Sequence, residues 1–175
     1  MSDKVLIAVV IAVVVIVIAA VIAYFVVRML RGSMKITLAK NGFSPGEKVT
    51  GSFTMKTRKE IEGKRLFAAL VGKEVTERRE GDRTRTDTRE IYRDEQTLEE
   101  GKTYPAGNTS DYSFELNTPS EDGQGLPGSA VGQALDIGLD LLSGNRTDIR
   151  WTVEVRLDAK GVDLFDSRSV TINIS

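Results

Sequence analysis

The sequence predicts an all-β domain, an antiparallel β-sandwich with one short inserted helix, preceded by a single transmembrane α-helix. Three observations lead to this prediction. Residues 1–31 contain an apolar run of membrane-spanning length. The rest of the chain contains segments in which apolar and polar residues alternate, which is typical of half-buried strands. Gly and Pro turn signals separate these segments with no alternation of strands and helices, which favours an antiparallel sandwich over a parallel α/β sheet.

The apolar run extends from Val5 to Val27, and the Tyr24 hydroxyl is its one polar side-chain group. A helix needs roughly 20 residues to cross a bilayer, and a lone span must be helical because its backbone polar groups have to pair within the segment. We therefore expect a transmembrane helix with Tyr24 as an interfacial anchor. Two alternatives are a cleaved secretory signal, which usually has a shorter apolar stretch, and a pilin-like assembly helix.

Charge around the span predicts its orientation. It is followed by three basic residues that form the expected membrane-anchor flank, Arg28, Arg31 and Lys35. In front of it, Lys4 is offset by Asp3. The positive-inside rule therefore predicts a single-pass membrane protein with its soluble domain in the cytoplasm. Three N-x-S/T triplets fit the alternative, an extracytoplasmic domain; they begin at Asn108, Asn145 and Asn173.

The β domain is expected over residues 32–175. Alternation, or a short apolar run, predicts strands around 36–38, 49–55, 66–71, 112–116, 151–157 and 170–174. Turn signals at Asn41-Gly42 and Pro45-Gly46 separate the first two. The run Leu66–Val71 is apolar at both parities, which predicts a central strand covered on both faces.

A polar hairpin is expected between Glu77 and Glu95, with Gly81-Asp82 at its tip. Its candidate partner-binding residues are Arg83, Arg85 and Arg89, whose guanidinium groups suit phosphates, acidic headgroups or an acidic protein surface. Acidic residues are interleaved with these arginines. The near-neutral balance favours a solvated pair of strands with cross-strand ion pairs over a binding site.

A Gly-rich insertion is expected at about 121–147, with a helix between Ser129 and Ser143. Apolar residues recur at helical spacing along one side of this segment. Three of them are candidate partner contacts: Val131, Leu135 and Leu142. We expect this stripe to bury against the domain's own sandwich, with a partner subunit or the membrane surface as the alternative.

Composition limits the chemistry. The chain has no Cys and no His, which excludes Ser-His and Cys-His nucleophiles and metal sites built on thiolate or imidazole. Its 24 basic and 25 acidic residues give a formal charge of −1 and no bulk attraction for nucleic acid. We expect a protein that is not an enzyme and that has no cofactor, no metal site and no small-molecule substrate.

The segment Lys40-Asn-Gly-Phe-Ser-Pro-Gly-Glu-Lys-Val-Thr-Gly51 resembles the early signature of arrestin-like domains, in which an aromatic residue, a Pro-Gly-Glu turn and a Val-x-Gly strand follow in that order. Further segments resemble later parts of the family in the same order, and together they cover nearly all of 34–175: Leu66–Glu74, Gly101 with Tyr104-Pro105, Phe114–Ser120 and Trp151–Val155. The family includes the arrestins, a retromer subunit and bacterial sporulation-control proteins.

The resemblance implies an adaptor or scaffold, because the family's members are generally not enzymes. The chain departs from the family in having one sandwich where arrestins have two, and in its insertion after Ser120. For that reason no phosphate-sensing residue is carried over, and a shared fold does not establish a function.

We therefore predict a membrane-anchored, non-enzymatic adaptor or accessory subunit that binds other proteins of a membrane assembly. Its expected partners are the lipid bilayer and, through the transmembrane helix, other proteins or further copies of itself; nucleic acid is not expected. The alternative is a structural subunit of a filament or homo-oligomer, packed through the apolar N-terminal helices.

Overall fold

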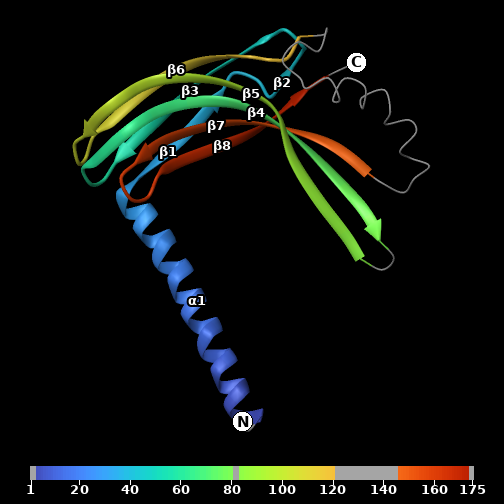
Figure 1. Cartoon of the computed structure of the whole chain (residues 1–175). Coiled ribbons are helices and arrows are strands. Elements are labelled where there is room, and N and C mark those ends of the chain that lie inside the picture. The colour runs from blue at the N-terminus through green and yellow to red at the C-terminus, as the bar shows by residue number, and fades with distance from the viewer. Residues whose placement is uncertain (1–2, 81–82, 121–145, 174–175) are drawn as a thin grey trace.

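The computed structural model of the chain describes residues 3–80, 83–120 and 146–173 (Figure 1). Within the N-terminal helix and beside residues 81–82, several side chains lie outside this description, including those of Arg28 and Arg83. One helix, α1 (Asp3–Arg31), precedes the strands. These are β1 (Gly32–Leu38), β2 (Gly42–Phe43), β3 (Lys48–Thr57), β4 (Ile61–Glu80), β5 (Arg83–Tyr104), β6 (Thr109–Asn117), β7 (Arg146–Ala159) and β8 (Leu164–Ile172).

The strands form two sheets that face each other across one core. The smaller sheet has the order β1-β3-β6 and the larger one the order β2-β8-β7-β4-β5. Every pairing is antiparallel except that of β2 with β8. Buried side chains from both sheets make up the core, such as Phe53 and Leu116 from the smaller sheet and Leu66 and Val153 from the larger. The predicted β-sandwich class is confirmed.

Strand β3 shows why alternation in the sequence was informative. Val49, Phe53 and Met55 are each at most 1% exposed and share the inner face with Gly51, while Thr50, Ser52 and Thr54 lie on the other face. Phe53 stacks on the Tyr112 ring of β6 with centroids 5.2 Å apart. Residues i and i+2 of a strand share one face, so a single apolar register fixes which face of β3 lies on the core.

Strand β4 is buried on both faces, as its unbroken apolar run predicts. Leu66, Ala68 and Leu70 belong to the main core. The alternate residues of the same run, Phe67, Ala69 and Val71, form a second buried cluster on the outer face of the sheet. Since β4 lies between β5 and β7, neighbouring side chains are available to cover that outer face.

The observed strands extend beyond several of the predicted ranges, and two predicted turn positions lie in strands. Gly42, expected in a turn, lies in β2, where Gly42 and Phe43 pair with Thr171 and Ile172 of β8. Phe43 is 2% exposed, and burying its ring holds this short parallel pair in place. Gly101, which with Tyr104-Pro105 resembles a turn of the arrestin-like family, lies inside β5 with a φ of +56°, and the turn comes after Tyr104.

The final strand begins earlier than predicted. Its first residue is Leu164, and β8 ends at Ile172. Leu164 is 1% exposed and pairs with Leu157 of β7, so the strand starts where a buried residue follows the turn. The predicted 129–143 helix falls outside the described residues, together with its three candidate contact residues, Val131, Leu135 and Leu142.

Side chains of the larger sheet form hydrogen bonds with backbone groups of β6, an edge strand of the smaller sheet. The Tyr92 hydroxyl donates to the Asn117 carbonyl at 2.7 Å, and the Asn117 amide donates to Asp94 at 2.6 Å. One residue pair further along, the Glu115 amide donates to the Gln96 side chain at 2.9 Å. An edge strand otherwise exposes free backbone groups that can pair with another chain, so these bonds protect β6.

The opposite edge of the smaller sheet is held in the same way. The Ile36 amide of β1 donates to the carboxylate of Asp166, on β8, at 2.9 Å. Side chains from the larger sheet therefore bond both edge strands of the smaller sheet and close the two sides of the sandwich.

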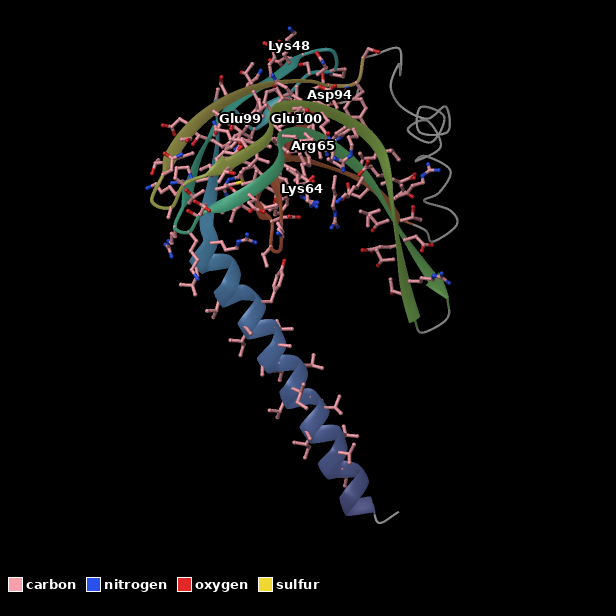
Figure 2. All side chains as sticks on the ribbon, turned by 60° about the vertical axis from the view of Figure 1, so that its left-hand side comes forward. Lys48, Lys64, Arg65, Asp94, Glu99 and Glu100 are labelled. Atoms are coloured by element: carbon pink, nitrogen blue, oxygen red, sulfur yellow. The ribbon has the colours of Figure 1, made fainter. Side chains whose placement is uncertain are left out.

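Strands β4 and β5 extend beyond the sandwich as a long hairpin, which we call the arm (Figure 1). They stay paired as far as Glu80 and Arg83, whereas β7 accompanies β4 only to the pair Glu77 and Arg146. The predicted hairpin of two long polar strands is confirmed. The arm projects to the same side of the sandwich as α1, in both views of the molecule (Figures 1 and 2).

Candidate functional site

The junction between the helix and the sandwich has no linker, because α1 ends at Arg31 and β1 begins at Gly32. The Arg31 carbonyl accepts hydrogen bonds from the backbone amides of Arg58, at 2.8 Å, and Lys59, at 3.4 Å. The Arg31 guanidinium donates to the carbonyls of Val162, at 2.9 Å, and Lys160, at 2.8 Å. One residue thus fastens the end of α1 to two separate loops of the sandwich.

Two glycines make room for this arrangement. Gly161 has a φ of +98°, and a Cβ there would lie 2.8 Å from Nη1 of Arg31. A Cβ on Gly32 would collide with the backbone carbonyl of Lys56. A larger residue at position 161 would adopt a strained backbone and displace the guanidinium as well. The junction is therefore built from Arg31 and these two glycines together.

The residues predicted as a membrane-anchor flank occupy different surroundings. Tyr24 is 52% exposed on α1. Arg31 is half-buried and bonded to the domain, as described above. Lys35 is exposed on β1, where it pairs with Thr54 of β3. The side chain of Arg28 lies outside the described part of the structure.

Helix α1 exposes its apolar side chains. The large apolar side chains described between Ile7 and Leu30 are between 47% and 67% exposed. Among the residues that the structure describes, no helix is both long enough and apolar enough to cross a membrane.

The three candidate arginines of the arm have different surroundings. Arg89 forms a 3.0 Å ion pair with Glu74, its partner on β4, and this is the cross-strand pairing that the interleaved charges predict. Arg85 is 70% exposed at its side chain and lies 3.8 Å from the Asp87 carboxylate. Arg83 is the strand partner of Glu80, and its side chain is outside the description.

Charged side chains cover the second buried cluster on the outer face of the larger sheet. The Arg65 guanidinium lies over the Phe67 ring at 4.3 Å and bonds Glu95 at 2.6 Å. Arg93 donates to Glu90 through two nitrogens at 2.9 Å. That hydrogen bond lowers the pKa of Glu90 and raises the pKa of Arg93. Since opposite charges are paired here, this face is a structural cover for the apolar residues beneath it.

A half-buried carboxylate joins β5 to β6. Glu99 accepts hydrogen bonds from the hydroxyls of Tyr104 and Tyr112, both at 2.8 Å, and from Lys102 at 2.5 Å. Burial would raise the pKa of Glu99, but these three bonds outweigh it and leave the pKa below its ordinary value. Burial, and then the bond to Glu99, raises the pKa of Tyr112 to about 12 and that of Tyr104 further.

This cluster predicts a late alkaline titration. The pKa of Tyr112 is higher in the fold than its ordinary value of 10.0, so its contribution to stability is complete below that pH and is lost as the pH rises through about 12. Glu99→Gln removes the carboxylate charge and should shift tyrosinate formation to lower pH in an absorbance titration. Tyr112→Phe should remove the component that titrates near pH 12 and leave the still later titration of Tyr104, and identical curves for wild type and Glu99→Gln would contradict the assignment.

None of these clusters is a metal centre: within residues 3–80, 83–120 and 146–173, no three acidic side chains gather as metal ligands. The charged side chains of these clusters bond carboxylates, hydroxyls or backbone carbonyls; they are Arg31, Arg65, Arg89, Arg93 and Glu99. What the arrangement provides is a fixed junction, a covered sandwich and an exposed arm, which together suit interaction with other surfaces.

No protein-family model and no curated protein sequence matches this chain. Among solved structures, it is similar to the crystal structure of Spo0M, a sporulation control protein from Bacillus subtilis, with a TM-score of 0.56 and 15% identity. The fold is arrestin-like. The match covers 83% of this chain and 50% of the Spo0M chain, so this chain spans about half the length of that protein. At this identity the likeness concerns the fold alone.

The features that sequence reasoning missed are contacts between distant segments. The Arg31 guanidinium bonds a carbonyl 131 residues further along the chain. In the sequence Arg31 follows an apolar run, and that position predicts a lipid-facing anchor as readily as a contact with the folded domain. The glycine at 161, between the segments that form β7 and β8, was the one available signal, because glycine is favoured at a turn or where another group approaches closely.

Proposed function

We propose that this chain is a membrane-anchored, non-enzymatic adaptor or accessory subunit, which presents an arrestin-like sandwich at the bilayer surface to other proteins of a membrane assembly. The observation that carries the proposal is the bonded junction at Arg31. A domain that searches for partners on a tether is joined by a flexible linker of many residues. A junction without a linker instead holds the sandwich in one orientation relative to its anchor.

The anchor itself is the part of the proposal that α1 supports. The helix has 29 residues, and at about 1.5 Å per residue such a helix is roughly 44 Å long, more than the ~30 Å of a hydrocarbon core. Apolar surface in water costs about 25 cal/mol per Å², so the exposed side chains of α1 favour burial in lipid or against other helices. The basic residues behind the helix favour a cytoplasmic domain.

A second candidate function is a structural subunit of a filament or homo-oligomer. The same exposed apolar surface of α1 supports it, because such helices can pack against copies of themselves. The protected edges of the smaller sheet speak against assembly through strand addition at those edges. A homopolymer of this chain would therefore form through α1.

Membrane fractionation tests the anchor. The full-length chain with a C-terminal tag should stay in the membrane pellet after alkaline carbonate washing. Val14→Asp with Ile18→Asp places two carboxylates on one face of the helix, at about 2.5–3.5 kcal/mol each at a bilayer centre, and should release the protein. Val14→Leu with Ile18→Leu is the matched control and should stay in the pellet. Release of the wild-type chain by carbonate would overturn the proposal.

Gentle detergent extraction separates the two candidates. An adaptor should elute as a small species or together with unrelated proteins, whereas a filament subunit should sediment as a large homopolymer. Protease treatment of sealed cells adds the orientation. A protected C-terminal tag agrees with a cytoplasmic adaptor, and digestion from outside would make the extracytoplasmic alternative correct.

A further inference from the structure

We propose that an extended segment of a partner protein binds β7 as an added strand, with an apolar groove beside that strand holding its side chains. The site, which we call the β7 edge, consists of the strand residues 147–150 and the groove residues Trp151, Val170, Thr171 and Ile172. This inference rests on the proposed adaptor role, for which it names the kind of partner, and it does not depend on the membrane anchor.

Strand β7 has one neighbour along its whole length and a second along only part of it. Strand β4 pairs with β7 from Arg146 to Ala159. Strand β8 pairs with β7 from Leu157 only as far as Trp151. Residues 146–150 are therefore paired on the β4 side, and no residue that the structure describes pairs with them on the other side. A strand edge of this kind presents backbone N–H and C=O groups to another chain.

The groove forms where β8 turns away from β7. Val170 is the last residue of β8 opposite β7, and Thr171 and Ile172 pair with β2 instead. Figure 1 shows this divergence, with β7 (orange) continuing beside β4 while the end of β8 (red) leads away from it. Between the two strands lies a hollow of about 380 Å³. Trp151, Val170 and Ile172 line it and are each at most 7% exposed, and Ile149 beside them is half-buried.

The other described edges carry features that oppose strand addition. Side chains of the larger sheet bond the backbone of β1 and β6, as described above. Strand β2 is only two residues long. In the arm, residues 84–90 of β5 are all threonine or charged. Proteins use short, covered and charged edges to avoid pairing with other chains. The β7 edge instead combines open backbone groups with apolar neighbours, which favours a binding role.

The side chains of the β7 edge define a complementary partner sequence. Asp148 and Arg150 lie on the outer face, with 58% and 64% of their side chains exposed, whereas Ile149 packs toward the core. An added strand takes the place that β8 leaves, and β8 is antiparallel to β7. Residues directly opposite each other in such a pair lie on the same face. Read from its N-terminus, the partner segment therefore has an acidic, an apolar and a basic residue, opposite Arg150, Ile149 and Asp148.

A second copy of this chain suits the edge less well than another protein does. In a two-fold pairing of β7 with itself, a register centred on Asp148 sets two aspartates opposite each other, which is destabilising. A register centred on Ile149 sets Asp148 opposite Arg150. It also sets Thr147 of the second copy opposite Trp151, where Val170 already lies. Charge opposes the first register and space opposes the second, so we assign the edge to a segment of a different protein.

The test uses Trp151, the sole tryptophan, as a reporter in the groove. The full-length chain in detergent micelles is titrated with two capped peptides of identical composition, Gly-Glu-Val-Lys-Val-Gly and Gly-Lys-Val-Glu-Val-Gly. The first should change the Trp151 emission in a saturable way, and hydrogen exchange at residues 147–150 should slow when it binds. The second should bind about tenfold more weakly, because it sets like charges opposite Asp148 and Arg150.

Exchanging the charges of the edge should reverse this preference. Asp148→Arg with Arg150→Asp keeps opposite charges at two exposed positions that already form a 3.4 Å ion pair, so the fold should be unaffected. This variant should bind the second peptide about tenfold more tightly than the first. The matched control, Lys48→Glu with Glu115→Lys, exchanges an exposed ion pair of the smaller sheet and should keep the wild-type preference. Circular dichroism melts of both variants should agree with that of the wild type.

The remaining outcomes separate this site from the adaptor role. No binding of either peptide, equal binding of both, or an unreversed preference in the charge-exchanged variant would overturn the β7 edge as a peptide site and leave the adaptor role to another surface. A dimer that the first peptide dissociates in sedimentation experiments would assign the edge to a second copy and reject a different protein. Sedimentation of the chain as a large homopolymer would overturn the adaptor role itself, whatever the peptides do.

Discussion

Trp151→Ala should lower the free energy of unfolding by about 3–5 kcal/mol, the usual cost of removing a large aromatic side chain from a core. Trp151 is 4% exposed in β7, between β4 and β8. Its ring meets the Tyr92 ring edge-on at 5.5 Å and lies over Gly72 of β4, its register partner. Urea unfolding followed by far-ultraviolet circular dichroism measures this, since Trp151 is the sole tryptophan and its own fluorescence is lost in the variant.

The contact between Trp151 and Gly72 gives the same prediction a sharper form. A Cβ on Gly72 would lie 2.6 Å from Cζ3 of the indole, so Gly72→Ala should cost about 1–3 kcal/mol by overpacking. In the Trp151→Ala background that cost should disappear, because the clashing ring is absent. Gly42→Ala, where a Cβ meets nothing within 4 Å, is the control. An equal cost of Gly72→Ala in both backgrounds would refute the contact.

Arg31→Gln should loosen the junction while the sandwich stays folded. A hydrogen bond to a charged group contributes about 2 kcal/mol, which corresponds to roughly a 30-fold change in a local opening equilibrium. Hydrogen exchange of the Arg58 amide reports this opening directly, since that amide donates to the Arg31 carbonyl. Its protection should fall by about that factor, and amides in the centre of β4 should be unchanged.

Gly161→Ala should reproduce the effect through a different atom. The added Cβ would occupy the space beside Nη1 of Arg31, at a backbone φ of +98°. Gly46→Ala is the matched control, because it imposes a similar backbone strain, at a φ of +75°, where a Cβ meets nothing within 4 Å. Unchanged exchange of Arg58 in both Arg31→Gln and Gly161→Ala would show that the guanidinium does not hold the junction.

The sequence predicted those parts of the fold that depend on local period. In β3 and β7 the core contacts repeat every second residue, so the alternation of Trp151, Val153 and Val155 with polar residues was sufficient. Strand β2 was missed because two residues have no period of their own. It exists because Phe43 is buried beside Ile172, which lies at the other end of the domain's sequence.

The candidate site was predicted in composition but not in arrangement. Interleaved charges between Glu77 and Glu95 gave no preference for either end of the hairpin. Only the register places Arg78 opposite Arg85 and Glu74 opposite Arg89. The role of Arg31 likewise depends on loops that approach it from the far end of the chain, and these contacts follow from the closed sandwich.

The linkerless junction also couples the rotation of the sandwich to the rotation of α1. A helix turns by about 100° and rises about 1.5 Å with each residue. One residue inserted into α1 would therefore swing the arm around the helix axis by more than a quarter turn, while barely changing its height. In a membrane assembly, the side of α1 that meets a neighbouring helix determines the direction in which the arm points about the helix axis. Seven inserted residues, close to two full turns, would nearly restore that direction. The number of residues in α1 between a helix contact and the junction therefore sets the rotation of the sandwich about the helix axis.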